Sequence, residues 1–172
     1  MSWSSFAAAL AGTRIGTTYN QYASSRFLEL RLAEYLERRS CAELLLVGEA
    51  AGYRGARVSG LPFTSERQLT GRGPAEASAT IVQRTLANLS LVDDVLLWNV
   101  VPTHPGTETS NRRPTRADVE DSRPFLDELA RGRRVIAVGR LAQAVTGAVY
   151  VRHPSHGGTR AFASGLALAV SE

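Results

Sequence analysis

The sequence predicts a three-layer α/β/α fold in which helices cover both faces of a central four-stranded parallel sheet. Four short apolar runs have the length and composition of buried strands. Segments rich in helix-forming residues separate these runs, and strands that alternate with helices are typical of parallel sheets. The chain has 172 residues, of which 44% are hydrophobic and 21% charged, and this predicts one globular domain over residues 1–172.

In the first half of the chain, two predicted helices flank one predicted strand. Residues 20–39 combine spaced apolar residues with helix formers, which predicts a long helix. The continuous apolar run 44–47 predicts a buried strand that ends at Gly48, and a glycine-rich stretch follows it. Residues 74–89 predict a second helix, with a proline near its start.

The second half of the chain repeats this alternation. We expect strands at 95–98, 135–138 and 148–151, and helices at 116–130, 140–145 and from 159 onward. The polar, proline-rich segment 99–116 is longer than most connections, and loops of this length in compact domains are usually functional or disordered.

The residues that follow the predicted strands suggest where a ligand binds. In open parallel sheets, ligands bind at the carboxyl ends of the strands. In chain order the four strands are followed by Gly48-Glu49, Asn99, Gly139-Arg140 and His153-Pro154-Ser155. Three of these endings suit chemistry or amide recognition, so we expect them to converge on one rim of the sheet.

The charge of the chain favours a polyanionic partner. The net charge is +4 and the isoelectric point is about 9.8. All twenty basic residues are arginine, so no lysine side chain is available to form a Schiff base, and the N-terminal amine is the remaining candidate for that chemistry.

Cysteine content and hydropathy point to a cytoplasmic protein without a metal or other cofactor. Cys41 is the one cysteine, which excludes an internal disulfide, a four-cysteine zinc site and a cysteine-ligated iron–sulfur cluster within one chain. No run approaches the ~20 apolar residues that span a bilayer. No basic residue precedes the short apolar stretch 6–10, so we expect no signal peptide. Without an oligomerisation signal, we expect a monomer.

Three segments of the chain resemble motifs of one enzyme family. Residues 48–66 read GEAAGYRGARVSGLPFTSE, residues 96–105 read LLWNVVPTHP, and residues 153–158 read HPSHGG. In order, spacing and placement they resemble the first motif, the second strand with its uracil-reading asparagine, and the His-Pro-Ser loop of the uracil-DNA glycosylase superfamily. The resemblance covers residues 44–162. A His-Pro-Ser tripeptide alone is a weak signal, whereas the three segments together are specific.

The resemblance implies a pocket for a flipped uracil. Its residues would be Gly48, Ala50, Gly52, Phe63 and Asn99 for substrate binding, with Glu49 and His153 for catalysis. The Asn99 amide would accept from N3–H and donate to O4 of uracil. Phe63 would stack on the base, and His153 and backbone N–H groups of the 48–51 turn would face O2. Each residue also has an alternative interpretation. Asn99 would be a turn residue after a strand, Phe63 an aromatic residue of the core, and His153 a buried histidine that bonds to the backbone.

Two positions depart from the family pattern. Ala50 stands where the best-studied branch has a water-positioning aspartate, so we assign to Glu49 the holding of water and the stabilisation of positive charge on the sugar. Alternatively, Glu49 fixes the loop through backbone N–H groups. Gly52 stands where strict uracil enzymes have a tyrosine that excludes the thymine methyl. Discrimination of uracil from thymine then comes from another side chain, for which the adjacent Tyr53 is a candidate, or it is relaxed. The branch with an iron–sulfur cluster has a similar Gly-Glu-Ala-Pro-Gly stretch, but the cysteines are missing here, which indicates a cluster-free branch.

The rim of the predicted sheet would hold the DNA. The expected contacts are Arg112, Arg113, Arg116, Ser155, His156, Gly157 and Arg160. A solvated charged surface is the alternative for each arginine. The family inserts a wedge after its His-Pro-Ser stretch, and here His156 or a residue of the long loop would take that role.

The predicted function is a monofunctional DNA glycosylase. It would flip uracil out of DNA and hydrolyse its N-glycosidic bond, leaving an abasic site for base excision repair. The alternatives are a non-catalytic protein that binds uracil or abasic sites in DNA, and a glycosylase with broader base specificity. A nucleotide-binding module is disfavoured, because the glycine-rich loop has neither the GxGxxG pattern nor a P-loop lysine.

Overall fold

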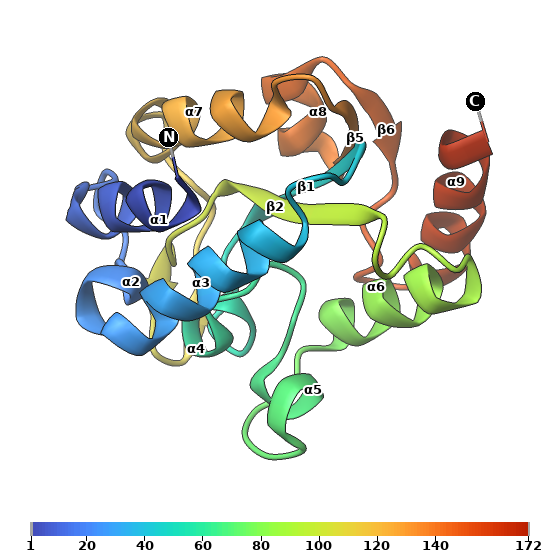
Figure 1. Ribbon diagram of the computed structural model, residues 1–172. Helices are drawn as coiled ribbons and strands as arrows, with labels where there is room; N and C mark the ends of the chain where they lie inside the picture. The colour runs from blue at the N-terminus through green and yellow to red at the C-terminus, as the bar shows by residue number, and fades with distance from the viewer. Residues whose placement is uncertain (1, 172) are drawn as a thin grey trace.

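A computed structural model describes residues 2–171 and confirms the predicted α/β/α fold with a four-stranded, all-parallel sheet (Figure 1). The strand order is β2-β1-β5-β6. The strands are β1 (Leu44–Ala50), β2 (Val95–Val101), β5 (Arg134–Val138) and β6 (Val149–Val151). The central position of β1 places the first predicted motif in the middle of the sheet.

The connections between the strands form the two helical layers. The connecting helices are α6 (Ala77–Asn88) from β1 to β2, α7 (Arg116–Ala130) from β2 to β5, and α8 (Arg140–Thr146) from β5 to β6. Because β2 and β5 lie on opposite sides of β1, right-handed crossovers place α6 on one face and α7 with α8 on the other. Figure 1 shows this division, and α9 (Thr159–Ser171) runs beside β6 at the far edge.

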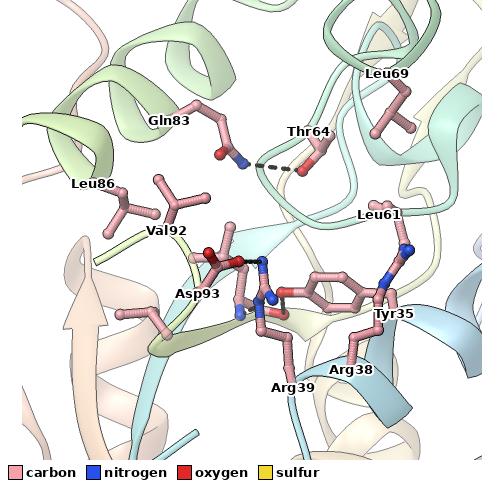
Figure 2. A pocket seen from close by; sticks show the side chains of 12 residues that line it. Tyr35, Arg38, Arg39, Leu61, Thr64, Leu69, Gln83, Leu86, Val92 and Asp93 are labelled. Atoms are coloured by element: carbon pink, nitrogen blue, oxygen red, sulfur yellow. Dashed lines mark hydrogen bonds and ion pairs between the residues drawn. The ribbon is translucent and has the colours of Figure 1, made fainter. Parts of the chain in front are cut away.

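The N-terminal helices cover the free edge of β2. They are α1 (Trp3–Gly12), α2 (Gln21–Ser24) and α3 (Arg26–Arg38). The Tyr35 hydroxyl on α3 accepts a hydrogen bond from the Leu97 N–H at 2.8 Å and lies 3.5 Å from the Leu97 carbonyl oxygen (Figure 2). Phe6 on α1 packs edge-to-face against Trp98, with 5.9 Å between ring centroids. All of β2 is therefore buried, and its backbone edge is protected from pairing with another chain.

The predicted long helix over residues 20–39 is two helices. Ser25 has an extended backbone, and its hydroxyl accepts from the Leu28 N–H to begin α3. The Asn20 side chain begins α2 in the same way, by accepting from the Tyr22 and Ala23 N–H groups. Two N-cap residues thus override the continuous helical pattern. The apolar stretch 6–10, for which we predicted no structure, lies within α1.

Other differences concern the ends of elements. Helix α6 begins at Ala77 rather than Pro74, because the Pro74 carbonyl accepts from the Arg67 N–H in the preceding turn. The glycine-rich stretch holds α4 (Ala56–Ser59), and α5 (Glu66–Thr70) follows it. The long loop holds a hairpin of β3 (Gly106–Thr107) and β4 (Ser110–Asn111).

Strands β1 and β2 extend further than predicted. Gly48 pairs with Asn99 and Ala50 with Val101. Glu49 and Asn99 therefore lie within the paired ends of the two strands rather than after them. Glycine and asparagine are poor strand formers, and parallel pairing outweighs that preference here. No helix in residues 2–171 combines the length and apolar character needed to cross a membrane.

Candidate active site

A small pocket lies at the carboxyl ends of β1 and β2. Its volume is about 40 Å³. It is lined by Glu49, Ala50, Gly52, Ala56, Phe63, Glu76, Ser78, Asn99 and His153. The fold therefore brings together six of the seven residues predicted for substrate binding and catalysis, and the seventh, Gly48, lies directly beneath Phe63 and Asn99.

Gly48 allows an aromatic ring and an amide to meet. A Cβ atom at this position would stand 2.7 Å from Asn99 Oδ1 and would collide with the Phe63 ring. Both side chains are buried, with exposed fractions of 9% for Phe63 and 4% for Asn99. Phe63 has a φ of 49°, a left-handed conformation that is rare for a bulky residue and costs roughly 1–3 kcal/mol. Gln83 supports this turn by donating a 2.9 Å hydrogen bond to the Phe63 carbonyl.

His153 presents a hydrogen-bond donor from the other side of β1. The Ser155 N–H donates to His153 Nδ1 at 3.2 Å, and the Ser155 hydroxyl lies 2.8 Å from the same nitrogen. Because Nδ1 accepts, a neutral ring carries its hydrogen on Nε2. Burial, with a smaller effect of the charge on His156, lowers the pKa of His153. The neutral Nε2–H form is thus favoured near pH 7.

A tight turn holds His153 in place. A Cβ atom on Gly158 would collide with the His153 carbonyl oxygen, so only glycine fits there. Gly157 and the exposed His156 both have positive φ angles, of 75° and 50°. The loop thus turns back on itself and carries His156 into the cleft outside the pocket.

Glu49 is exposed at the pocket entrance. Its carboxylate makes no hydrogen bond with any residue in the range 2–171, so the geometry does not show it fixing the loop. His104 fixes that loop instead, because its buried ring lies 2.7 Å from the carbonyl oxygens of both Ala51 and Thr107. The expectation that backbone N–H groups of residues 48–51 face O2 fails for Ala51, whose N–H donates to the Val101 carbonyl.

Glu76 is a pocket residue that the sequence reasoning missed. Its carboxyl oxygens occupy the space where a Cβ atom on Gly52 or Gly55 would stand. Burial raises the pKa of this carboxyl, opposed by a hydrogen bond from Ser78. Tyr53, the neighbour considered for this space, instead lies with its ring 5.3 Å from the Arg54 guanidinium. No sequence motif marks Glu76, which lies in the short connection between α5 and α6.

A wider cleft of about 490 Å³ adjoins the pocket. Of the residues predicted to contact DNA, those lining it are Arg112, Arg113, Ser155 and His156. Arg140, whose guanidinium lies 4.3 Å from the Tyr150 ring centroid, also lines the cleft and was missed. Its position directly after β5 was the signal that could have identified it. Gly157, Arg116 and Arg160 are exposed but do not line the cleft.

Two of the predicted DNA-binding arginines have partners within the protein. The Arg112 guanidinium bonds the buried carboxylate of Asp118 at 2.6 Å and the Thr17 hydroxyl at 2.9 Å. Arg116 pairs with Glu120 along α7. Arg112 therefore anchors the long loop to α7, besides lining the cleft.

A second pocket, of about 320 Å³, lies beside the edge of β2 (Figure 2). None of the predicted site residues lines it, and the Arg39–Asp93 ion pair of 3.0 Å occupies its rim. Within residues 2–171, no three His, Cys, Asp or Glu side chains come together in a way that could hold a metal ion. The pocket at the strand ends is therefore the candidate active site.

The fold and the position of this pocket are those of the α/β proteins, whose ligands bind at the carboxyl edge of a parallel sheet. A model of the uracil DNA glycosylase superfamily matches residues 39–167, and the chain belongs to this superfamily. No curated protein matches the sequence. The structure is similar to the crystal structure of wild-type Pedobacter heparinus SMUG2, with a TM-score of 0.68, 12% identity and 100% of both chains covered. At this identity, the similarity shows the fold alone.

Proposed function

We propose that this protein is a monofunctional DNA glycosylase that flips uracil out of DNA and hydrolyses its N-glycosidic bond. The observation that carries the proposal is the meeting of Asn99, Phe63 and His153 in one pocket beside an arginine-lined cleft. An amide, an aromatic ring and an imidazole N–H match the polar edge, the face and the O2 atom of a pyrimidine. We expect the protein to act as a monomer.

Base recognition uses the two side chains that meet over Gly48. The Asn99 Oδ1 atom accepts from N3–H of uracil, and its Nδ2 group donates to O4. The Phe63 ring stacks on the base. Because Asn99 is buried in β2 and its neighbours are fixed by sheet pairing, its amide is preorganised before the base enters.

Bond cleavage places negative charge on the base and positive charge on the sugar. As the C1′–N1 bond breaks, its electron pair moves to N1 and O2, where His153 Nε2–H donates a hydrogen bond. One such donor contributes roughly 3–4 kcal/mol. The exposed Glu49 carboxylate stabilises the cationic sugar and orients a water molecule that adds to C1′. This carboxylate accepts the proton that the water gives up, and uracil leaves as its anion. Because the chain has no lysine side chain to form a Schiff base with the sugar, we expect the reaction to end at the abasic site, with the N-terminal amine as the alternative nucleophile.

A cleavage assay tests this proposal. Oligonucleotides with a single deoxyuridine, thymidine or deoxyinosine are incubated with protein and then treated with hot alkali. We expect strand cleavage at uracil that depends on the alkali step. Cleavage without alkali would contradict a monofunctional mechanism. Absence of cleavage together with a gel shift on the same DNA would favour a non-catalytic binding protein, a candidate motivated by Ala50.

Two variants separate catalysis from binding. His153→Ala and Glu49→Gln are each expected to slow single-turnover uracil release by about 100-fold or more while DNA binding is retained. Glu43→Gln is the matched control, because Glu43 is an exposed carboxylate just before the opposite end of β1. Activity that survives both pocket changes would show that the assigned roles are wrong.

A further inference from the structure

A second carboxyl group, that of Glu76, stands at the pocket, and the proposed mechanism does not use it. Glu76 is the residue before α6, and the start of that helix positions it. Its backbone N–H donates to Ser65 Oγ at 2.9 Å, and its carbonyl accepts from the Thr80 N–H. The main chain on both sides is therefore fixed, and it directs the side chain toward the loop after β1.

Two glycines form the niche that receives this carboxyl. A Cβ atom on Gly52 or on Gly55 would collide with a Glu76 carboxyl oxygen. Neither glycine has a φ in the left-handed range. A side chain at either position would need the space that the Glu76 carboxyl occupies.

The carboxyl has little internal compensation for its burial. Within the described part of the chain, its one hydrogen bond from a side chain is a long contact of 3.4 Å from Ser78 Oγ. Among residues 2–171, no basic side chain forms an ion pair with it. Burial accordingly raises its pKa. Because Glu76 is only partly exposed and has few partners, hydrogen bonds from solvent are what remain to solvate its carboxyl.

The geometry of base binding determines which edge of the base faces this group. In the proposed complex, Asn99 takes N3 and O4 of uracil, and His153 takes O2. The glycosidic nitrogen points toward the cleft and the DNA, and Phe63 covers one face of the ring. The edge that carries C5 and C6 is left for the wall formed by Glu76 over Gly52.

We propose that Glu76 is a specificity-determining residue whose carboxyl group, held over Gly52 and Gly55, excludes pyrimidines that carry a 5-methyl group. A methyl group in this place would displace the water that solvates the carboxyl and offer no hydrogen bond in return. Uracil, with only a hydrogen at C5, leaves that water in place. This inference rests on the proposed function, since it assumes that a uracil enters the pocket.

The test compares uracil and thymine in otherwise identical duplexes, each base opposite guanine. Single-turnover rates are measured for wild type, Glu76→Ala, Glu76→Gln and the control Glu43→Ala. A pocket discriminates a single methylene-sized group by roughly 10–200-fold. We expect Glu76→Ala to reduce the preference for uracil by about 10-fold or more, mainly by raising thymine release. Glu76→Gln preserves volume and polarity and should retain most of the preference, as should Glu43→Ala.

The possible failures are distinguishable. A wild-type uracil preference that is unchanged in a folded Glu76→Ala variant would overturn the role of Glu76 while leaving the glycosylase proposal intact. Equal wild-type release of thymine and uracil would do the same. If wild type releases neither base, the catalytic proposal fails. The same uracil-to-thymine comparison by equilibrium gel shift then decides the Glu76 assignment, with an unchanged ratio in Glu76→Ala overturning it. If Glu76→Ala does not fold, Glu76→Ser serves in either assay, because it also removes the carboxyl group and supplies a favourable N-cap for α6.

Discussion

Replacing Gly48 with alanine should lower activity by displacing Asn99 and Phe63 in the candidate active site, while the chain stays folded. The added methyl group would stand 2.7 Å from Asn99 Oδ1, about 0.7 Å short of the 3.4 Å at which ordinary contact begins, and closer still to the Phe63 ring. Gly48 lies in a paired strand and has no positive φ, so alanine adds no backbone strain. The effect of the substitution is therefore purely one of space.

The size of the effect follows from these contacts. Overpacking by one methyl group costs about 1–3 kcal/mol of folding stability. Asn99 and Phe63 must each move by several tenths of an ångström or more, and a 1 Å misplacement of a positioning group costs about 100-fold in rate. We therefore expect Gly48→Ala to lower the single-turnover rate of uracil release by about 100-fold or more. A 100-fold loss of rate corresponds to about 2.7 kcal/mol, similar to the loss of folding stability. A domain stabilised by about 5–15 kcal/mol nevertheless stays folded after such a loss.

Two measurements on the same preparations test this reasoning. Chemical denaturation gives the free energy of unfolding, and single-turnover cleavage of uracil-containing DNA gives the rate. Gly12→Ala is the matched control, because a Cβ atom on Gly12 at the end of α1 meets nothing within 4 Å. A Gly48→Ala variant with wild-type activity would show that Phe63 and Asn99 do not need the positions seen here.

Three further predictions concern protonation and charge. Because burial lowers the pKa of His153, an NMR titration of its ring should have a midpoint below the usual histidine value of about 6.5; a midpoint above it would contradict a neutral ring near pH 7. Burial opposes ionisation of Asp118, but hydrogen bonds from Arg112 and neighbouring N–H groups outweigh it and lower its pKa. Such a group stabilises the fold above its unfolded pKa and loses that contribution in acid. Asp118→Asn should therefore lower the free energy of unfolding by roughly 3 kcal/mol at pH 7. Urea titrations should show this difference from wild type shrinking below about pH 4. Arg140→Ala should weaken DNA binding and reduce the slope of log K against log salt by about 0.9, whereas an unchanged slope would argue against a phosphate contact.

Local sequence was sufficient to predict the bounds of a helix where the helix is stabilised by its own residues. Helix α7 has the predicted bounds 116–130, because a capping box of Thr115 and Asp118 defines its start within four residues. The helix predicted over 20–39 failed for a related reason. Caps at Asn20 and Ser25 were present in the sequence, but a continuous apolar pattern hid them.

The approach of Asn99 and His153 to one pocket could be expected because the topology of a parallel sheet brings its carboxyl ends together. The detailed geometry of the site could not be expected from the sequence, since it depends on pairing between distant segments. Sheet register, for example, carries β1 and β2 past Gly48 and Asn99 and gives the Ala51 N–H a backbone partner.

The sequence by itself determined the α/β/α class, the order of the strands along the chain, and the residues that carry the family resemblance. These depend on apolar periodicity and on motifs that are contiguous in the chain. Only the tertiary structure decided that Glu76 occupies the space above Gly52 and that Arg112 is bonded to Asp118. Each of these depends on how a helix packs against a loop, and the burial that shifts the pKa of Glu76 exists only once that packing has formed.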